Sequence, residues 1–523
     1  MSSIFEAINR FFEFIVPIAD FLWDFPTNFE WYASIPILGK FTFAILLLIG
    51  SGIYFTFKTS FVQIVHFKKG LKIMINNKAS ENGISPLASF MLSSATRVGA
   101  GNIMGVTGAI SVGGPGALFW MWLSAFFGMS IAFAEAVLAQ IYKVDTGREY
   151  VGGLPFYGKK ILGDKRWVGY LLSFIFIIYA LFSVPGQVFH IFTALGSVAD
   201  TVAGTTFERT SPVYYIIAVS LIILVTAVVF GGIKGVTKVS DKVVPVMALV
   251  YISIALLLII FNLDQIPYFF TSVFKGAFSP EAIFGGGFGV ALAQGIKRGL
   301  MSNEAGQGTI TMAAAVSENN HPCEQGFIQV IGVFLDTIII CTLSGFIVIL
   351  AHVWDGNAGV VWDTISGSKI TVFTSSVKYL VPGTSFDNFF TVIMSLCYAL
   401  FAFTSLIGLI CFAEISANLI STKRSVINIV RGTGALVLAP FGALTVLSGL
   451  ELGNLWYISD FVNIMVVYAN VPIVLVAQQT VIKALKHYNE TNGKRFISKE
   501  IGIETDFWTE ENAIKAEKAN KTS

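Results

Sequence analysis

Apolar runs recur from one end of the chain to the other, separated by short polar stretches. Runs of about 20 residues are what an α-helix needs to cross the hydrocarbon core of a bilayer. The pattern therefore predicts an all-α polytopic membrane protein with about eleven transmembrane helices. The expected spans cover residues 36–57, 86–112, 117–142, 168–195, 213–230, 244–261, 281–316, 327–350, 386–420, 426–447 and 455–485.

Two of these spans contain an interruption, at residues 95–102 and at residues 294–308. Each glycine weakens a helix interior by ~1 kcal/mol relative to alanine, and an arginine inside a membrane is costly. Irregular backbone at membrane depth persists only where protein or a water-filled cavity satisfies its polar groups. A bound solute can use the same groups. The alternative is that Gly99 and Gly101 only let two helices pack closely.

The two interrupted spans lie five spans apart and carry the same residue types in the same order. These residues are Arg97, Gly99 and Asn102 in one span and Arg298, Gly299 and Asn303 in the other. Interrupted segments at corresponding positions of two halves indicate inverted repeats with a binding site at their interface. The predicted repeats are residues 86–262 and 281–485. The other expected parts are an amphipathic N-terminal segment (1–35), an extra transmembrane helix with a basic cytoplasmic loop (36–85), and a polar cytoplasmic tail (486–523).

Composition and charge narrow the class further. The chain is 54% hydrophobic and 13% charged with a mean hydropathy of +0.73, whereas soluble domains are roughly 25% charged. The net charge of +2 and the lack of a basic stripe give no sign of a nucleic-acid partner. The four cysteines show no CxxC spacing, which argues against zinc or a disulfide framework. No HExxH or GxSxG motif is present, so an enzyme is not expected.

Basic residues set the expected orientation, because cytoplasmic loops carry an excess of lysine and arginine. They gather after the first, third and fifth spans and in the C-terminal tail. The prediction is a cell (inner) membrane protein with its N-terminus outside and its C-terminus in the cytoplasm. The loop at 317–325 is an exception, since it should be cytoplasmic and has no basic residue. The N-terminus lacks the basic region of a cleavable signal peptide.

Several motifs, taken in order, resemble the alanine or glycine:cation symporter family. They are the runs 99–106 and 113–122, Glu135, the stretch 297–306, the pairs 321–322 and 325–326, the run 334–337, the set Phe403, Thr404, Gly408 and Glu414, and the set Trp456, Asp460, Asn463 and Asn470. The resemblance covers most of residues 86–485. It implies a LeuT-type fold of two inverted five-helix repeats that moves a small neutral amino acid inward with sodium, without an obligate protein partner.

The substrate site follows from the chemistry of a zwitterion. The N–H groups of Gly99, Ala100 and Gly101, at the start of a helix near Asn102, suit a carboxylate. Carbonyls around Gln294 and Gly295 would receive the ammonium.

The resemblance adds two wall positions. Gln187 matches a glutamine that faces substrate in the family, while its neighbours Phe189 and His190 depart from the family pattern. His190 is interpreted as a helix-packing residue rather than a proton relay. Leu409 stands where many relatives carry tryptophan. The smaller side chain makes glutamine an alternative substrate to alanine or glycine.

The resemblance also implies a sodium site. Thr404 and Ser405 look like the hydroxyl pair of the ion site shared by LeuT-type transporters, and the carbonyls of Ala95, Val98 and Phe401 would complete it. The alternative is that both hydroxyls bond only to carbonyls of their own helix.

Arg97 lies where other LeuT-type carriers place a first sodium. One hypothesis is that its guanidinium substitutes for that ion. The other is a structural pair with Glu135, Glu304 or Asp336. Glu304 and Asp336 are interpreted as structural counter-ions, and a proton-coupled carrier would need one of them. Arg298 is a further electrostatic or structural candidate. A channel is disfavoured, because a continuous polar pore lining is not evident.

Overall fold

The computed structural model describes residues 7, 9–35, 38–76, 79–80, 82–279, 287–354, 369–381, 386–448 and 453–514. Within these ranges the chain is helical, apart from one antiparallel pair of two-residue strands, β1 (Val144–Asp145) and β2 (Tyr150–Val151). The expected all-α class is therefore correct except for this small hairpin. The beginnings of the first and seventh predicted spans, and most of the loop 351–385, lie outside the described residues.

The helices of the first half begin with short elements and continue into long apolar ones. They are α2 (Ile15–Asp24), α3 (Glu30–Ala33), η1 (Leu38–Lys40), α4 (Phe43–Lys58), α5 (Val62–Val65), α6 (Phe67–Asn76), α7 (Pro86–Arg97), η2 (Gly101–Gly105), α8 (Val106–Gly113), α9 (Gly116–Ile141), α10 (Leu154–Ile161), α11 (Arg166–Phe182), α12 (Val184–Ala203), α13 (Pro212–Val229) and α14 (Gly232–Phe261).

The second half continues in the same way. Its elements are η3 (Leu263–Gln265), α15 (Ile266–Phe278), α17 (Gly287–Asn303), α18 (Ile310–Ala315), α19 (Pro322–Val333), η4 (Phe334–Cys341), α20 (Thr342–Leu350), α22 (Lys369–Leu380), α23 (Asp387–Ala417), α24 (Arg424–Gly432), η5 (Thr433–Leu438), α25 (Ala439–Leu447), α26 (Gly453–Val476), α27 (Gln478–Thr491) and η6 (Ser498–Ile501).

Eight helical stretches in the described part of the chain are long and apolar enough to cross a membrane. The other predicted spans are α4, a shorter apolar helix, and the two interrupted segments, each of whose halves is short. The most enclosed long helix is α23, which packs against α7, α11, α12 and α14. The apolar core thus surrounds the elements that carry the predicted site.

Three boundaries differ from the sequence prediction. The fourth span is divided into α11 and α12 near Ser183, just before Pro185, whose nitrogen cannot donate a helical hydrogen bond. The sixth helix, α14, already begins at Gly232, so the basic residues expected in a loop lie on its first turns. The predicted eleventh span ends earlier, because α26 stops at Val476 and the chain continues as α27.

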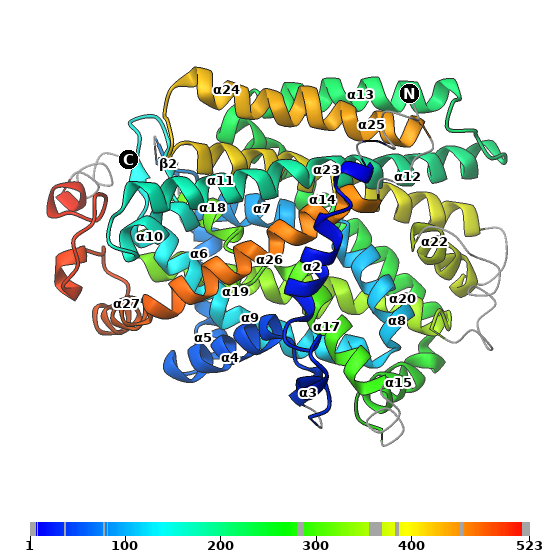
Figure 1. Cartoon of the computed structure of the whole chain (residues 1–523), viewed down its shortest axis with the longest axis horizontal. Helices are drawn as coiled ribbons and strands as arrows, with labels where there is room; N and C mark the ends of the chain where they lie inside the picture. The colour runs from blue at the N-terminus through cyan, green and yellow to red at the C-terminus, as the bar shows by residue number, and fades with distance from the viewer. Residues whose placement is uncertain are drawn as a thin grey trace.

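Different elements lie at the left and right ends of the molecule in Figure 1. Residues 492–513, drawn in red, lie at the left beside α10, β2 and α27, while α8, α15, α20 and α22 lie at the right. In both interrupted segments, the half nearer the left end is α7 or α18, and the half nearer the right end is α8 or α17. The breaks therefore fall between the two ends of the molecule.

The N-terminal helix α2 lies along the protein. It packs against α26, where it buries Ile15, Ala19 and Trp23. The Trp23 indole donates a hydrogen bond of 3.1 Å to the carbonyl of Asp460, and the Lys297 ammonium lies 4.4 Å from the Trp23 ring. The amphipathic face predicted for this segment thus covers α26.

Candidate functional site

The first interruption lies where the sequence predicts it. Helix α7 ends at Arg97, Val98 has left the helical conformation (φ −79°, ψ 77°), and a π-helical turn starts at Gly101. A Cβ at Gly99 would lie 2.5 Å from the Ser405 hydroxyl, so a side chain does not fit there. The amide of Gly99 donates to Asn102 Oδ1 at 2.8 Å. Asn102 therefore stabilises the break from within the same segment.

The second interruption occupies only the last part of the predicted stretch 294–308. Helix α17 runs without a break to Asn303, and the irregular stretch comes between Glu304 and α18. Left-handed backbone marks this stretch, with φ of 58° at Glu304, 87° at Gly306 and 71° at Gly308.

Gln294 and Gly295 lie inside α17, away from the irregular stretch, which corrects their expected place at the break. A Cβ at Gly295 would lie 2.3 Å from the carbonyl oxygen of Ala117 and 2.6 Å from the Cβ of Trp120. This glycine therefore permits close packing of α17 on α9. Gln294 lines a separate small hollow between α4 and α17.

A buried carboxylate on α9 accepts hydrogen bonds from the backbone of the second interruption. Glu135 accepts hydrogen bonds from the amides of Gly306 and Gly308 at 3.2 Å and 3.0 Å, and a third from the side-chain amide of Asn470. Asn470 also donates to the carbonyl of Gly306 at 2.9 Å. Unpaired backbone groups are expensive at membrane depth, so these contacts give the irregular stretch its stability.

A second buried carboxylate joins the two interrupted segments to each other. Asp336, on the π-helical stretch η4, accepts hydrogen bonds from Asn102 Nδ2 at 2.5 Å and from the Ser302 hydroxyl at 3.0 Å. Thr337 donates a third bond at 2.7 Å. Asn102 belongs to the first interruption and Ser302 to α17, so Asp336 links one interrupted segment to the other.

Arg97 is held by neutral oxygen atoms. Its Nε donates to the Asn303 carbonyl and its Nη2 to Gln329 Oε1, each at 3.0 Å. Within the described residues, no carboxylate lies within 4 Å of this guanidinium, so the contact pair with Glu135, Glu304 or Asp336, one of the two hypotheses for Arg97, is not formed. The side chain is 1% exposed, and its Nη1 has no hydrogen-bond partner in the described part of the chain.

A cavity of ≈ 610 Å³ lies at the interruptions and extends toward α22. It is bounded by both interrupted segments and by α12, α23 and α26. Its lining residues are Thr96, Arg97, Gly99, Ala100, Gly101, Met104, Gly105, Tyr179, Ser183, Gly186, Gln187, Phe189, His190, Thr193, Arg298, Met301, Ser302, Glu304, Ile370, Tyr398, Ser405, Leu409, Ser459, Asp460 and Asn463.

The cavity offers partners for both signs of charge. Two amide oxygens on its wall, Gln187 Oε1 and Asn463 Oδ1, are buried without a hydrogen-bond partner in the described residues. Glu304 adds a carboxylate that accepts from Thr96 at 3.1 Å and from Thr309 at 3.0 Å. Arg298 also lines the cavity and adds a second cationic side chain to that of Arg97. Acceptors that lack a partner in a buried wall suit a ligand that brings its own donors.

The expected sodium ligands are partly assembled. Ser405 Oγ lies 3.3 Å from the Ala95 carbonyl of α7 and 3.0 Å from the Phe401 carbonyl of its own helix. Thr404 Oγ1 donates to Phe401 at 3.1 Å. Both hydroxyls therefore bond to a carbonyl of their own helix, as the alternative to a sodium site predicts. Only Ser405 also reaches α7. Val98 is the first residue after α7.

Some wall residues escaped the sequence analysis. Tyr398 hydrogen-bonds His190 Nδ1 at 2.7 Å, so His190 is a cavity residue with a tyrosine partner as well as a packing residue. Ser183 and Ser459 face each other at 2.8 Å between α12 and α26. Nothing in the local sequence marks these residues, because each reaches the cavity only through helix packing. Asp460 and Asn463 carried a signal, since both belong to the resembling motifs.

The fold and the site define the class. The fold is similar to that of MhsT crystallised in complex with L-phenylalanine, with a TM-score of 0.54 and 13% identity over 79% of this chain and all of that one. Two helices interrupted around a polar central cavity, in a chain of many apolar helices, are the architecture of a secondary transporter with a LeuT-type fold. The eight long apolar helices of the described residues make it a multi-pass membrane protein.

The family follows from sequence comparison. The sequence model of the Sodium:alanine symporter family matches residues 30–501, and the chain belongs to that family. It is 35% identical over 463 residues to the amino-acid carrier protein AlsT of Bacillus subtilis, with 88% of this chain and 90% of AlsT covered. It is 34% identical to the probable sodium/glutamine symporter GlnT of the same organism, with 85% and 87% covered. It is also 34% identical to the sodium/alanine symporter AgcS of Methanococcus maripaludis, with 86% and 94% covered. Its membership of a symporter family makes it a transporter and not an enzyme.

Gly332 should be intolerant of any side chain because of Arg97. A Cβ at Gly332 would lie 1.7 Å from Arg97 Nη1. We expect Gly332→Ala to lower the stability of the detergent-solubilised protein by about 1–3 kcal/mol, the usual effect of overpacking. Thermal unfolding measures this. In an Arg97→Ala background the same substitution should cost little, and Gly50→Ala, where no atom lies within 4 Å, is the matched control. Equal losses with and without Arg97 would contradict the explanation.

Proposed function

We propose that this protein is a sodium-coupled symporter that carries a small neutral amino acid, alanine or glycine, into the cell by alternating access. The observation that carries the proposal is the cavity at two interrupted helices, which presents both charge signs and backbone polar groups to one central space. The proposed setting is the cell (inner) membrane, with the N-terminus outside and the C-terminus in the cytoplasm, as the basic loops indicate.

The substrate carboxylate is assigned to the first interruption. The Gly99 amide is engaged by Asn102, so Ala100 and Gly101 are the amides proposed to meet the carboxylate. Gly101 is exposed at the cavity and starts a helical segment, where the helix dipole favours a negative group. Asn102 supports this arrangement through Gly99 and Asp336 and does not itself contact the ligand.

The substrate ammonium is assigned to acceptors elsewhere on the cavity wall. Gln187 Oε1 and Asn463 Oδ1 have no hydrogen-bond partner in the described residues, and the Glu304 carboxylate also faces the cavity. An ammonium brings three donors and repays the burial of such oxygens. This assignment replaces the carbonyls around Gln294 and Gly295, which lie in the packed interior of α17.

The coupling ion is assigned to the junction of α7 and α23. Carbonyl and hydroxyl oxygens are the ligands that a hard cation such as sodium prefers, and Ala95, Val98, Phe401, Thr404 and Ser405 supply them. An ion there would join the first interrupted helix to α23. Because Ser405 also lines the cavity, sodium and substrate would bind cooperatively, and each would raise the affinity of the other by the same factor.

Glutamine is the second candidate substrate. Leu409 lines the cavity where a bulkier side chain would narrow it, and one relative is described as a probable sodium/glutamine symporter. Coupling of substrate transport to protons is a distinct alternative. Glu304 could carry the proton, because its carboxylate reaches the cavity without an ion pair in the described residues.

Uptake into proteoliposomes tests the substrate and the ion. We expect labelled alanine or glycine to accumulate under an imposed inward sodium gradient and to exchange with unlabelled substrate in counterflow. Accumulation driven by a proton gradient alone would overturn sodium coupling. Equilibration without counterflow would indicate a channel.

Leu409→Trp should narrow the cavity, so that competition by glutamine falls about tenfold or more while alanine uptake persists, since one misfit group in a pocket has effects of this size.

The proposed sodium site is tested by substitutions of three hydroxyl side chains on α23. Ser405→Ala and Thr404→Val should raise the half-saturating sodium concentration about tenfold, because an oxygen ligand to a charge contributes about 1.5–3 kcal/mol. Ser395→Ala is the matched control, since the Ser395 hydroxyl is buried on the same helix without a hydrogen-bond partner in the described residues. Sodium dependence that is the same in all three variants would remove the ion from this junction.

Arg97 is tested by its effect on stoichiometry. If its guanidinium replaces a first sodium, the wild-type protein should couple one sodium to each substrate. Arg97→Ala should then weaken substrate binding about tenfold or more, by the loss of a charge-assisted contact. Arg97→Lys keeps the charge but cannot reach two acceptors with one planar fork, so an intermediate effect is expected. Wild-type affinity and stoichiometry in both variants would exclude Arg97 from the mechanism.

A further inference from the structure

Residues 492–513 are packed onto the protein at the face opposite α22 (Figure 1). The sequence predicts only a polar tail there. In the structure, Phe496, Phe507 and Trp508 are buried, and Trp508 is among the largest fully buried side chains of the described residues. We call residues 492–513 the C-terminal segment.

Beneath this segment, the start of α7 and the end of α18 meet. The amide of Ile84, just before α7, donates to the Val316 carbonyl at 3.0 Å, and the amide of Glu318 donates back to the Ile84 carbonyl at 2.8 Å. Deeper in, Ser89 of α7 donates to the Ala313 carbonyl of α18 at 2.7 Å. Helices α7 and α18 are thus tied together at this face.

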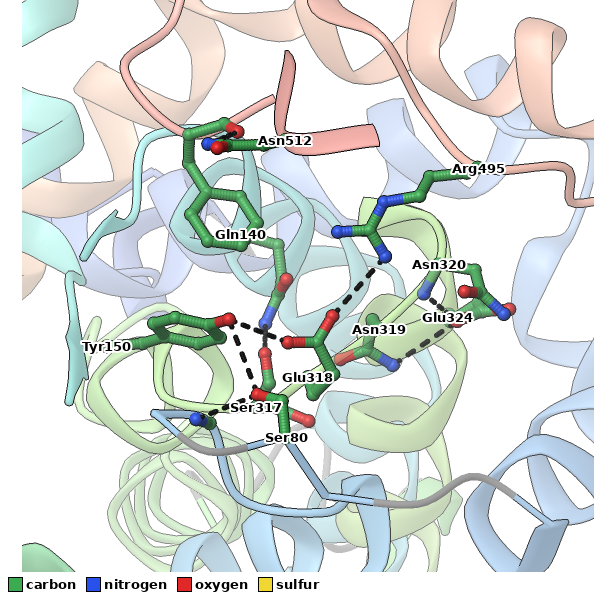
Figure 2. A network of polar contacts seen from close by, with 12 residues as sticks. Ser80, Gln140, Tyr150, Ser317, Glu318, Asn319, Asn320, Glu324, Arg495 and Asn512 are labelled. Carbon is green, nitrogen blue, oxygen red and sulfur yellow. Dashed lines mark hydrogen bonds and ion pairs between the residues drawn. The ribbon is translucent and has the colours of Figure 1, made fainter. Parts of the chain in front are cut away.

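The C-terminal segment closes over that tie. Arg495 forms an ion pair of 3.4 Å with Glu318, and the amide of Phe496 donates to the Asn320 carbonyl at 2.9 Å. Figure 2 shows Arg495 reaching down to Glu318, which also receives the Tyr150 hydroxyl at 2.8 Å. The charges of Lys143 and Arg495 lower the pKa of Glu318 below its usual value, although burial opposes them. The carboxylate is therefore ionised where the segment binds.

Aromatic residues of the segment complete a cage around a buried lysine. The Lys143 ammonium lies 4.2 Å from the Phe507 ring and 5.1 Å from the Trp508 ring, both of the segment, and 4.6 Å from the Tyr150 ring. It donates to the Ser317 carbonyl at 2.7 Å. Burial lowers its pKa to about 7, and Glu318 opposes that shift. Ring faces attract a cation, so the charged form gains contacts that only the docked segment supplies.

The same segment also contacts the other part of the helical body. The Trp508 indole donates to the Gln140 carbonyl at the end of α9 at 2.6 Å, and Asp506 forms an ion pair of 3.3 Å with Lys160 on α10. Helix α10 packs against α11, which packs against α23. The segment therefore spans from the interrupted spans and α9 on one side to the α10–α11–α23 side on the other.

We propose that the C-terminal segment is a latch: docked, it holds this face of the transporter shut across the ends of α7 and α18, and it must leave Glu318 and Asn320 before the cavity opens here. The proposal rests on the proposed alternating-access function. A path through this face must separate the interrupted spans from the α10–α11–α23 side. Arg495, Phe496 and Trp508 hold the segment to the first side, and Asp506 holds it to Lys160 on the second, so separation must break one of these two sets of contacts.

A reversible covalent lock tests the latch. In Glu318→Cys/Arg495→Cys protein, a short thiol cross-linker that contains a cleavable disulfide should join the segment to the loop. We expect sodium-driven uptake in proteoliposomes to fall about tenfold or more on cross-linking and to return on reduction, since a locked state blocks every turnover. The four native cysteines are buried, and each single variant controls for their reaction.

Lys486→Cys/Glu490→Cys is the matched control. These two exposed residues form a 3.7 Å pair within α27, so cross-linking them should leave uptake unchanged. A tail that stays docked throughout the cycle would transport equally well when locked, and that result would overturn the latch. Absence of uptake by the parent protein before any cross-linking would instead refute the proposed function.

Hydrogen exchange in the unaltered protein gives a second measurement that needs no variant. The amide of Phe496 is bonded to the Asn320 carbonyl outside the segment. During turnover with sodium and alanine on both sides of the membrane, its exchange should accelerate about fivefold or more over the sodium-free protein, because undocking breaks this bond. Equal protection under both conditions in a transporting sample would also overturn the latch.

Discussion

The structure depends on how a helix that stops inside a membrane keeps its backbone hydrogen-bonded. An interrupted segment leaves several N–H and C=O groups without a partner, and no lipid can replace water for them. Here the second interruption is satisfied by the Glu135 carboxylate and the Asn470 amide, which reach it from α9 and α26. The first is satisfied from within, by Asn102 on Gly99. The two solutions differ because the first segment keeps its amides beside the cavity, whereas the second is anchored in packed protein.

These supports also join the two interrupted segments to each other. Asp336 receives Asn102 from one interrupted segment and Ser302 from the other, and Arg97 crosses from α7 to Asn303 and Gln329. Because Arg97 bonds to neutral oxygens, its charge is not cancelled at contact distance. It acts on the cavity over a longer range in a poorly screening interior. A cation fixed at the wall changes which ligands the cavity favours, even without touching them.

Much of this arrangement could be predicted from sequence, and the failures have specific causes. Glycine, arginine and asparagine within an apolar run located the first interruption correctly. The same composition placed the start of the second too early, because Gly295 and Gly299 serve packing: their Cβ positions would lie 2.3 Å from Ala117 and from Ser124 of α9. Local composition does not distinguish a glycine that breaks a helix from one that admits a neighbour. The Tyr398–His190 contact and the burial of Trp508 were also missed, since each depends on segments distant in the chain.

The placement of the polar ties explains why the cavity lies on one side of the interruptions. Between the breaks and the C-terminal end, α7, α9 and α18 are joined by Ser89, by Gln140, which donates to the Ser317 carbonyl at 3.0 Å, and by the Ile84 bridge. On the other side the cavity separates the interrupted segments from α12 and α26. Packed interfaces joined in this way tend to have discrete alternative arrangements and do not deform continuously. In the proposed alternating-access cycle, the free energy of each closed face would depend on a countable set of contacts. The binding of the proposed substrate and ion would need to outweigh only those contacts to shift the balance between the two faces.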